Sequence, residues 1–202
     1  MDEVIIHILH TSLIKGNYAF ILSFVDEKRR VKAERYVHEK DRLLSLGAGY
    51  LLKKYLSNGE IKENSSGKPF LLNGPLFNLS HSGEYVVLAI HPSRDVGVDI
   101  ERIDENKIDA IKFVLNEEEK DVTDLNTLFR IWSNKESLIK CNAQGLKDIK
   151  HVCGLPLEGS KTYDDEDYFC KSMIYENYSL SITLKEKEPF NLFINRINCL
   201  EE

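Results

Sequence analysis

The sequence lacks the segments that direct a protein into a membrane or out of the cell. It has no apolar run long enough to cross a bilayer and no secretory signal pattern. Cysteine is scarce, and none of the four residues has the C-x-x-C spacing of a zinc site: Cys141, Cys153, Cys170 and Cys199. We therefore expect a cytoplasmic protein with free thiols and no cysteine zinc site.

An excess of positive charge is also missing. The chain has 27 Lys and Arg against 33 Asp and Glu, a net charge of −6. This balance excludes a global basic field of the kind that attracts nucleic acid or anionic membranes, so any anion site must be local. With 202 residues, 42% of them hydrophobic, the chain can build a real core as one large domain or two small fused ones.

The order of apolar patterns and turn residues predicts an α+β protein. Helical patterns cover residues 26–56, with a break near 38–41, and residues 107–121 and 125–141. Strand patterns cover residues 4–9, 77–82, 85–90, 96–101, 168–174 and 178–184. The order of these elements indicates two similar halves that meet near residue 101, although no sequence repeat accompanies it.

Two acids stand close together in the predicted strand 96–101. Alternation turns Val96, Val98 and Ile100 toward one face. Asp99 and Glu101 then share the opposite face. Like charges held this close require exposure to solvent, a raised pKa or a bound cation.

A third acid lies on the apolar face of the predicted helix 125–141. Glu136 follows Trp132 by four residues on that face, so it needs a cation, a proton or an open pocket. Lys140, four residues further on, offers a simple helix ion pair. If Glu136 instead converges with Asp99 and Glu101, the three carboxylates make an oxygen-rich site suited to Mg²⁺.

Several residues could bind phosphate near such a metal. Lys68 lies in a Gly-Lys-Pro turn, and Ser80 and His81 are neighbours in a polar cluster. Arg29 and Lys32 are three residues apart on the first predicted helix. Ordinary explanations also exist: His81 can be a structural histidine, and Arg29 and Lys32 can form an exposed basic helix face.

Taken in chain order, these segments resemble a known family. The motifs are Gly67-Lys68-Pro69-Phe70, Asn78-Leu79-Ser80-His81-Ser82, Gly97-Val98-Asp99-Ile100-Glu101 and Trp132-Ser133-Asn134-Lys135-Glu136 with Lys140. Their order over residues 20–185 resembles the 4′-phosphopantetheinyl transferases of the long, Sfp-type branch. The resemblance implies a pseudo-twofold α+β fold. Each half, residues 1–101 and residues 102–202, would have a helix packed on a small antiparallel sheet.

The resemblance also implies a set of site residues. Metal binding, of Mg²⁺ or alternatively Mn²⁺, would fall to Asp99, Glu101 and Glu136, and the catalytic residues would be Glu136, as the base, and Lys140, on the pyrophosphate. The nucleotide end of the substrate coenzyme A would contact Arg29, Lys32, Ser45, Lys68, Ser80 and His81. Glu119 could match a further family acid, although its acidic run also suits a solvated helix start.

The reaction implied is transfer of 4′-phosphopantetheine from coenzyme A to a serine of an apo acyl or peptidyl carrier protein, with release of 3′,5′-ADP. The branch serves nonribosomal peptide and polyketide synthetases, and a chain with both halves is expected to be a monomer. Carrier domains are commonly acidic, so docking on this acidic chain requires a local apolar or basic patch. The alternatives are a non-catalytic, regulatory coenzyme A-binding relative and an interaction module without a site.

One position departs from the family pattern. The family often continues its helix motif as K-x-x-G-x-G-L, whereas this chain has Ala143 at the first glycine position and keeps only Gly145. Alanine is harmless there if the residue is helical and unfavourable if the backbone needs a positive φ. The loop geometry, and not the metal site, depends on this substitution.

Overall fold

The computed structural model describes residues 2–56, 59–64, 67–143 and 149–201. The first part of the chain contains β1 (Glu3–His10), α1 (Thr11–Gly16), α2 (Tyr18–Phe24), α3 (Glu27–Glu34), α4 (Glu39–Tyr55), β2 (Ile61–Glu63), β3 (Pro69–Leu71), β4 (Leu76–Ser82) and β5 (Tyr85–His91). The second part contains β6 (Val96–Arg102), the 3-10 helix η1 (Glu105–Lys107), α5 (Ile108–Phe113), α6 (Leu125–Asn142), β7 (Glu158–Tyr163), β8 (Glu166–Tyr175), β9 (Tyr178–Leu184) and β10 (Asn191–Arg196).

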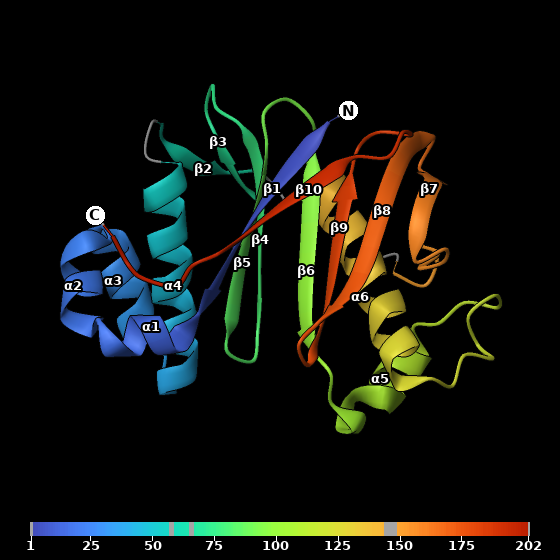
Figure 1. Cartoon of the computed structure of the whole chain (residues 1–202), viewed down its shortest axis with the longest axis horizontal. Helices are drawn as coiled ribbons and strands as arrows, with labels where there is room; N and C mark the ends of the chain where they lie inside the picture. The colour runs from blue at the N-terminus through green and yellow to red at the C-terminus, as the bar shows by residue number, and fades with distance from the viewer. Residues whose placement is uncertain (1, 57–58, 65–66, 144–148, 202) are drawn as a thin grey trace.

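Two sheets lie face to face between the long helices α4 and α6 (Figure 1). In the described part of the chain, the first sheet has the strand order β10-β1-β5-β4 and the second has β6-β9-β8-β7. A short hairpin of β2 and β3 lies beside the first sheet. The predicted α+β fold with a helix on each sheet is confirmed.

Alternation along the strands builds the core between the sheets. Val96, Val98 and Ile100 of β6 are fully buried there, against apolar side chains of β1, β5 and β9. The opposite face of the first sheet packs on α4 through a second apolar core. The predicted direction of the three β6 side chains is therefore confirmed, and Asp99 and Glu101 are left on the face that α6 covers.

A close and polar contact joins α6 to the second sheet. A Cβ on Gly97 would overlap the carbonyl oxygen of Ser137, so only glycine allows the helix to lie this near β6. Further along the interface, the Ser133 hydroxyl lies 2.6 Å from Ser179 Oγ and 2.7 Å from Ser181 Oγ. These hydroxyl pairs satisfy buried polar groups that the apolar pattern of the helix did not reveal.

The two sheets meet along a seam, defined here as the side-by-side strands β4 and β6. Alternate side-chain oxygens on β4 accept hydrogen bonds from alternate backbone amides on β6. The pairs are Val98 N to Asn78 Oδ1 (3.0 Å), Ile100 N to Ser80 Oγ (3.2 Å) and Arg102 N to Ser82 Oγ (3.1 Å). Side chains thus replace the backbone ladder that would otherwise cover this edge of β6.

The strands of the two sheets do not separate cleanly at residue 101, the predicted boundary between the halves. β6, which comes almost entirely before that point, pairs antiparallel with β9 in the second sheet. β10, near the end of the chain, returns to the first sheet and pairs parallel with β1. The division of the chain into halves at residue 101 stays a prediction.

The helix predicted over residues 107–121 is shorter than expected. Its helical part ends at Phe113, and turns follow. The acidic run explains the difference, because Glu119 turns inward instead of pointing to solvent and accepts a hydrogen bond from Asn116 N (2.9 Å). The break between α3 and α4 falls close to the predicted position.

Two further expectations concern the cysteines and the membrane. All four cysteines lie in the described part of the chain and are free, as predicted. None of the described helices has the length and apolar character needed to cross a bilayer.

The chain leaves α6 in a left-handed conformation at Ala143. This residue has φ 64° and ψ 19°, and its amide donates to Ile139 O at 2.9 Å. Alanine is therefore unfavourable at this position, because a residue with a Cβ is strained at positive φ. Gly145, the glycine that the chain keeps, lies outside the described residues.

We expect Ala143→Gly to stabilise the protein by about 1 kcal/mol, since glycine removes this strain at a small entropic cost. The free energy of unfolding from urea titration measures the effect. Ala110→Gly in the exposed middle of α5 is the matched control, and it should destabilise by about 1 kcal/mol. Equal destabilisation by both variants would contradict the assignment of strain to Ala143.

Candidate functional site

The strand acid Asp99 occupies a buried position beside the seam. It is 3% exposed, and its Oδ1 accepts hydrogen bonds from Ser80 Oγ at 2.9 Å and Lys140 Nζ at 2.6 Å. Its second oxygen, Oδ2, is buried and has no hydrogen-bond partner among the described residues. Burial raises the pKa of this carboxyl, while the Lys140 charge and the hydrogen bonds oppose that shift.

Glu136 approaches the same lysine from α6. Its Oε2 lies 3.7 Å from Lys140 Nζ, and its side chain is 12% exposed. Burial, and then the negative charge of Asp99, raise the pKa of Glu136 to about 7. For Lys140, burial favours the neutral amine, but Asp99 and Glu136 outweigh it and raise the pKa above its usual value. The group is thus one ammonium held between two carboxyls.

Glu101 is directed to other partners. Its Oε2 accepts a hydrogen bond from Ser82 Oγ at 3.0 Å and forms an ion pair with Lys107 Nζ at 2.9 Å. As the side chains stand, no three His, Cys, Asp or Glu residues in the described part of the chain form a cluster that could hold a metal ion. The structure therefore joins Asp99, Glu136 and Lys140 directly, and leaves Glu101 apart.

The donor set still fits a hard cation. Mg²⁺ commonly takes only one or two carboxylates and completes its shell with water and substrate phosphate oxygens. The buried Oδ2 of Asp99 is an unused carboxylate oxygen of this kind. A cation on it would compensate a buried acceptor that no donor in the described part of the chain reaches.

The phosphate candidates near the seam come from β4 and from the loop before β3. Ser80 is part of the seam and also receives a hydrogen bond from Lys140 Nζ at 3.2 Å. His81 is exposed as a residue, but desolvation of its imidazole and then the Lys140 charge lower its pKa. Lys68 donates to the Cys141 carbonyl at 3.3 Å, and burial lowers its pKa.

The other candidates lie on α3 and α4. Arg29 is half-buried and packs so closely over Gly49 that a Cβ there would touch its side chain at 2.5 Å. Lys32 is exposed, and Ser45 is buried with its hydroxyl unpaired among the described residues. These three make no hydrogen bond or ion pair with the described side chains of Asp99, Glu101 or Glu136.

Three residues at the site were not assigned a role from the sequence. Asn78 and Ser82 hold β6 in place, and Ser82 also holds Glu101. The alternation of Asn78, Ser80 and Ser82 was a usable signal, because oxygens two residues apart share a strand face. For Lys107 no such signal exists, since its approach to Glu101 depends on how the chain turns after β6.

A buried ion pair joins α6 to the segment before it. Lys135 and Glu119 are both fully buried, with Lys135 Nζ 2.6 Å from Glu119 Oε2 and 2.8 Å from the Val114 carbonyl. Glu119 also accepts a hydrogen bond from Gly154 N. This pair ties two loops to the helix turn that carries Glu136, so Glu119 is neither a solvated residue nor a neighbour of Asp99.

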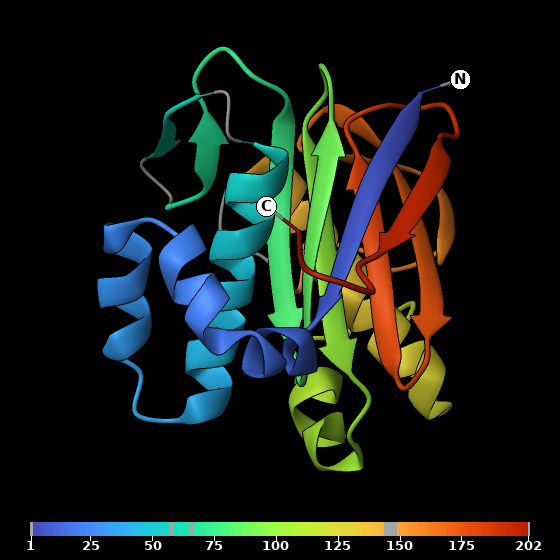
Figure 2. The same cartoon turned by 60° about the vertical axis from the view of Figure 1, so that its left-hand side comes forward.

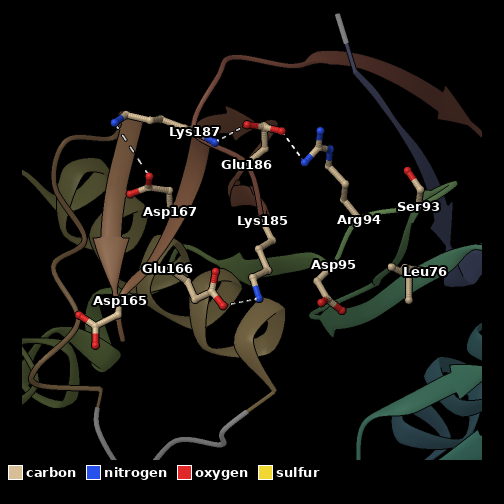
Figure 3. Close-up of a pocket in the computed structure, with 10 residues that line it drawn as sticks. All are labelled: Leu76, Ser93, Arg94, Asp95, Asp165, Glu166, Asp167, Lys185, Glu186 and Lys187. Atoms are coloured by element: carbon tan, nitrogen blue, oxygen red, sulfur yellow. Dashed lines mark hydrogen bonds and ion pairs between the residues drawn. The ribbon is translucent and has the colours of Figure 1, made fainter.

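A surface pocket lies elsewhere, where β5 and β6 connect and β8 and β9 approach (Figure 3). Its three basic side chains are each paired with an acid: Arg94 with Glu186, Lys185 with Glu166 at 3.0 Å and Lys187 with Asp167 at 4.0 Å. It contains none of the residues proposed from the sequence. We therefore place the candidate site at the seam and not in this pocket.

Comparisons with known proteins point to one family. One family model, described as "4'-phosphopantetheinyl transferase superfamily", matches residues 95–182, and another, "4'-phosphopantetheinyl transferase, N-terminal", matches residues 14–93. Together they cover both strands of the seam and all the candidate residues.

Curated relatives carry the same name. The "4'-phosphopantetheinyl transferase gsp" of Aneurinibacillus migulanus is 35% identical over 146 residues, which are 64% of this chain and 60% of the relative. Sfp of Bacillus subtilis (strain 168) is 30% identical over 142 residues, 62% of this chain and 63% of the relative. Another Bacillus subtilis transferase is 29% identical over 190 residues, with 77% and 84% covered. The chain thus spans about 60% of the length of the first two relatives.

We expect the raised pKa of Glu136 to make the stability of the metal-free protein depend on pH. The folded state binds its proton up to about pH 7, whereas the unfolded carboxyl loses it near its usual pKa of 4.5. The free energy of unfolding therefore falls as the pH rises through this window, by at most about 3 kcal/mol.

Urea unfolding in EDTA at pH 5 and pH 8 measures this dependence. Glu136→Gln removes the titrating group and should flatten the profile, whereas Glu117→Gln, a change at an exposed acid, should leave it unchanged. An unaltered profile in Glu136→Gln would show that this carboxyl does not titrate as described.

Proposed function

The chain belongs to the 4′-phosphopantetheinyl transferase superfamily, and we propose that it transfers 4′-phosphopantetheine from coenzyme A to a carrier-protein serine. The acceptor is an apo acyl or peptidyl carrier protein, and the product released is 3′,5′-ADP. The observation that carries the proposal is the group of Asp99, Lys140 and Glu136 beside the seam, where a buried carboxylate oxygen has no hydrogen-bond partner among the residues that the structure describes.

The metal proposed is Mg²⁺, with Mn²⁺ as the alternative. Asp99 and Glu136 would hold it together with Glu101, once Glu101 leaves Lys107. When bound, the ion supplies positive charge against the pyrophosphate of coenzyme A. The donor chemistry supports this assignment, since all three side chains offer hard oxygen ligands.

Lys140 and Glu136 are the proposed catalytic residues. Attack of the serine oxygen on the β-phosphorus forms one P–O bond and breaks the bond to 3′,5′-ADP, so negative charge grows on the leaving phosphate. Lys140 has a raised pKa and remains an ammonium that can donate to that phosphate. Glu136, with a pKa of about 7 in the metal-free protein, is suited to accept the serine proton.

The nucleotide end of coenzyme A would lie on the first-sheet side of the seam. The candidate residues there are Arg29, Lys32, Ser45, Lys68, Ser80 and His81. Ser45 has a buried hydroxyl without a described partner, and Lys68 is a partly desolvated ammonium near the end of α6. A hydrogen bond to a phosphate or ribose oxygen would compensate the cost of burying each of these two groups.

The competing function is coenzyme A binding without transfer, as in a regulatory relative. The complete set of Asp99, Glu136 and Lys140 favours the enzyme, because binding alone does not need a poised acid beside an ammonium. We further propose that the enzyme acts as a monomer on carriers of nonribosomal peptide or polyketide synthetases.

We expect the purified protein, with coenzyme A and Mg²⁺, to add one phosphopantetheinyl group to an apo carrier domain, as measured by intact mass. Asp99→Asn should reduce the rate at least 100-fold, because it removes the buried carboxylate that pairs with Lys140. Asp109→Asn, the same change at an exposed acid of α5, is the control and should retain the rate.

Two results would contradict the proposal. Unmodified carriers across acyl and peptidyl types, with coenzyme A still bound in calorimetry, would indicate the regulatory relative. If Asp99→Asn transfers the group as fast as the Asp109→Asn control, then Asp99 has no role in the mechanism.

A further inference from the structure

One face of α3 and the turn after it carry exposed apolar and basic side chains. Helical spacing of three and four residues places Lys28, Val31, Lys32 and Arg35 on this face, and all four are exposed. Next to them, Tyr36 and Val37 are 38% and 87% exposed, and Val31 is 42% exposed. The term α3 patch is used here for Lys28, Val31, Arg35, Tyr36 and Val37, while Lys32 on the same face stays a coenzyme A candidate.

The charge of this segment is opposite to that of the whole protein. Residues 27–37 contain five basic and two acidic side chains, whereas the net charge of the chain is −6. A local basic surface on an acidic protein attracts an acidic partner while the rest of the molecule repels it. We therefore expect an acidic partner to bind with its acidic surface facing this segment.

The inner face of α3 is firmly attached, so the patch is already formed without a partner. Ala33 is 1% exposed, and Arg29 packs over Gly49 of α4. Arg30 Nη1 donates to the Leu22 carbonyl at 3.1 Å. A preformed surface binds without the entropic cost of ordering a loop.

The patch flanks the candidate site. Figure 2 shows α3 as the outermost helix on the side of the first sheet where β4 lies. The turn after α3 leads into α4, whose Asp41 acts electrostatically on the His81 imidazole. His81 is also within the influence of Lys140, which contacts Asp99. A partner on the α3 patch would thus lie on the β4 side of the first sheet, the side on which the seam lies.

Other exposed apolar side chains are less suited to an acidic partner. Phe113 is 71% exposed, but Lys150 Nζ lies 3.7 Å from the centre of its ring, and Glu117 and Glu118 follow closely in the chain. Phe193 is 56% exposed on β10, the strand at the opposite edge of the first sheet from β4. Charge complementarity and position both favour α3.

We propose that the α3 patch is the docking surface for the acidic carrier domain, an inference that rests on the proposed function. Val31, Tyr36 and Val37 provide the apolar contact, and Lys28 and Arg35 provide the charge. Apolar side chains at the centre with cations at the rim are the arrangement expected of a transient interface with an acidic protein.

The test compares steady-state kinetics of the wild-type protein with those of Arg35→Glu combined with Val37→Asp. The Michaelis constant for the carrier should rise at least 10-fold, and the constant for coenzyme A should stay within twofold. Phe193→Asp, which places the same acid on another exposed apolar site, should change neither constant more than twofold. Lys28→Glu alone should raise the carrier constant and weaken its dependence on salt.

Direct binding of the apo carrier, measured by fluorescence anisotropy without coenzyme A, separates docking from transfer. A wild-type protein that binds carriers through the patch but modifies none would contradict the proposed function and keep the docking surface. Transfer with an unchanged carrier constant in both patch variants would overturn the docking surface alone. Weakened binding of the double variant to anionic vesicles, or loss of self-association, with carrier affinity unchanged would assign the patch to that other occupant and overturn the proposal.

Discussion

The arrangement of the site depends on hydrogen bonds from the β6 backbone to side-chain oxygens of β4. A sheet edge exposes amides that must be paired, and here Asn78, Ser80 and Ser82 accept from three of them at successive alternate positions. The two sheets can therefore come together at an edge without forming one continuous sheet. The same serines also bind Asp99 and Glu101, so the contact that joins the sheets orients the acids.

Charge balance gives the two strand acids different environments. Asp99 shares Lys140 with Glu136 and is almost completely buried, whereas Glu101 pairs with Lys107 nearer the surface. Equal spacing on one strand face thus leads to unequal electrostatics, because the helices on that side reach the two positions with different cations. One of the three remedies anticipated for the pair, a raised pKa, is found at Asp99, which also pairs with the ammonium of Lys140.

α6 combines three kinds of contact, which explains why its polar residues stand on buried positions. Ser133 bonds to hydroxyls of β9, Lys135 forms the buried pair with Glu119, and Glu136 faces Lys140. Ser133 is satisfied by β9 and Lys135 by the segment before α6, whereas Glu136 pairs with Lys140 of α6 itself, so these buried charges have partners. The helix can then present its carboxyl and ammonium at the seam on a rigid support.

The sequence by itself determined the elements that depend on local patterns. Alternation was sufficient to orient Val96, Val98 and Ile100 inward, and the apolar stripe of α6 was sufficient to place Glu136 on a buried face. The ordered motifs were sufficient to identify the family. These properties follow from periods of two and 3.6 residues, which a single segment carries in full.

Only the tertiary structure decided which groups meet. The partners of Glu101, the inward turn of Glu119 and the return of β10 to the first sheet join residues that are remote or differently oriented in the chain. The left-handed backbone at Ala143 was likewise undetermined, since alanine is compatible with a continuing helix. The physical reason is that a hydrogen bond or ion pair depends on ångström-scale distances between elements, and local periodicity does not fix how separate elements pack.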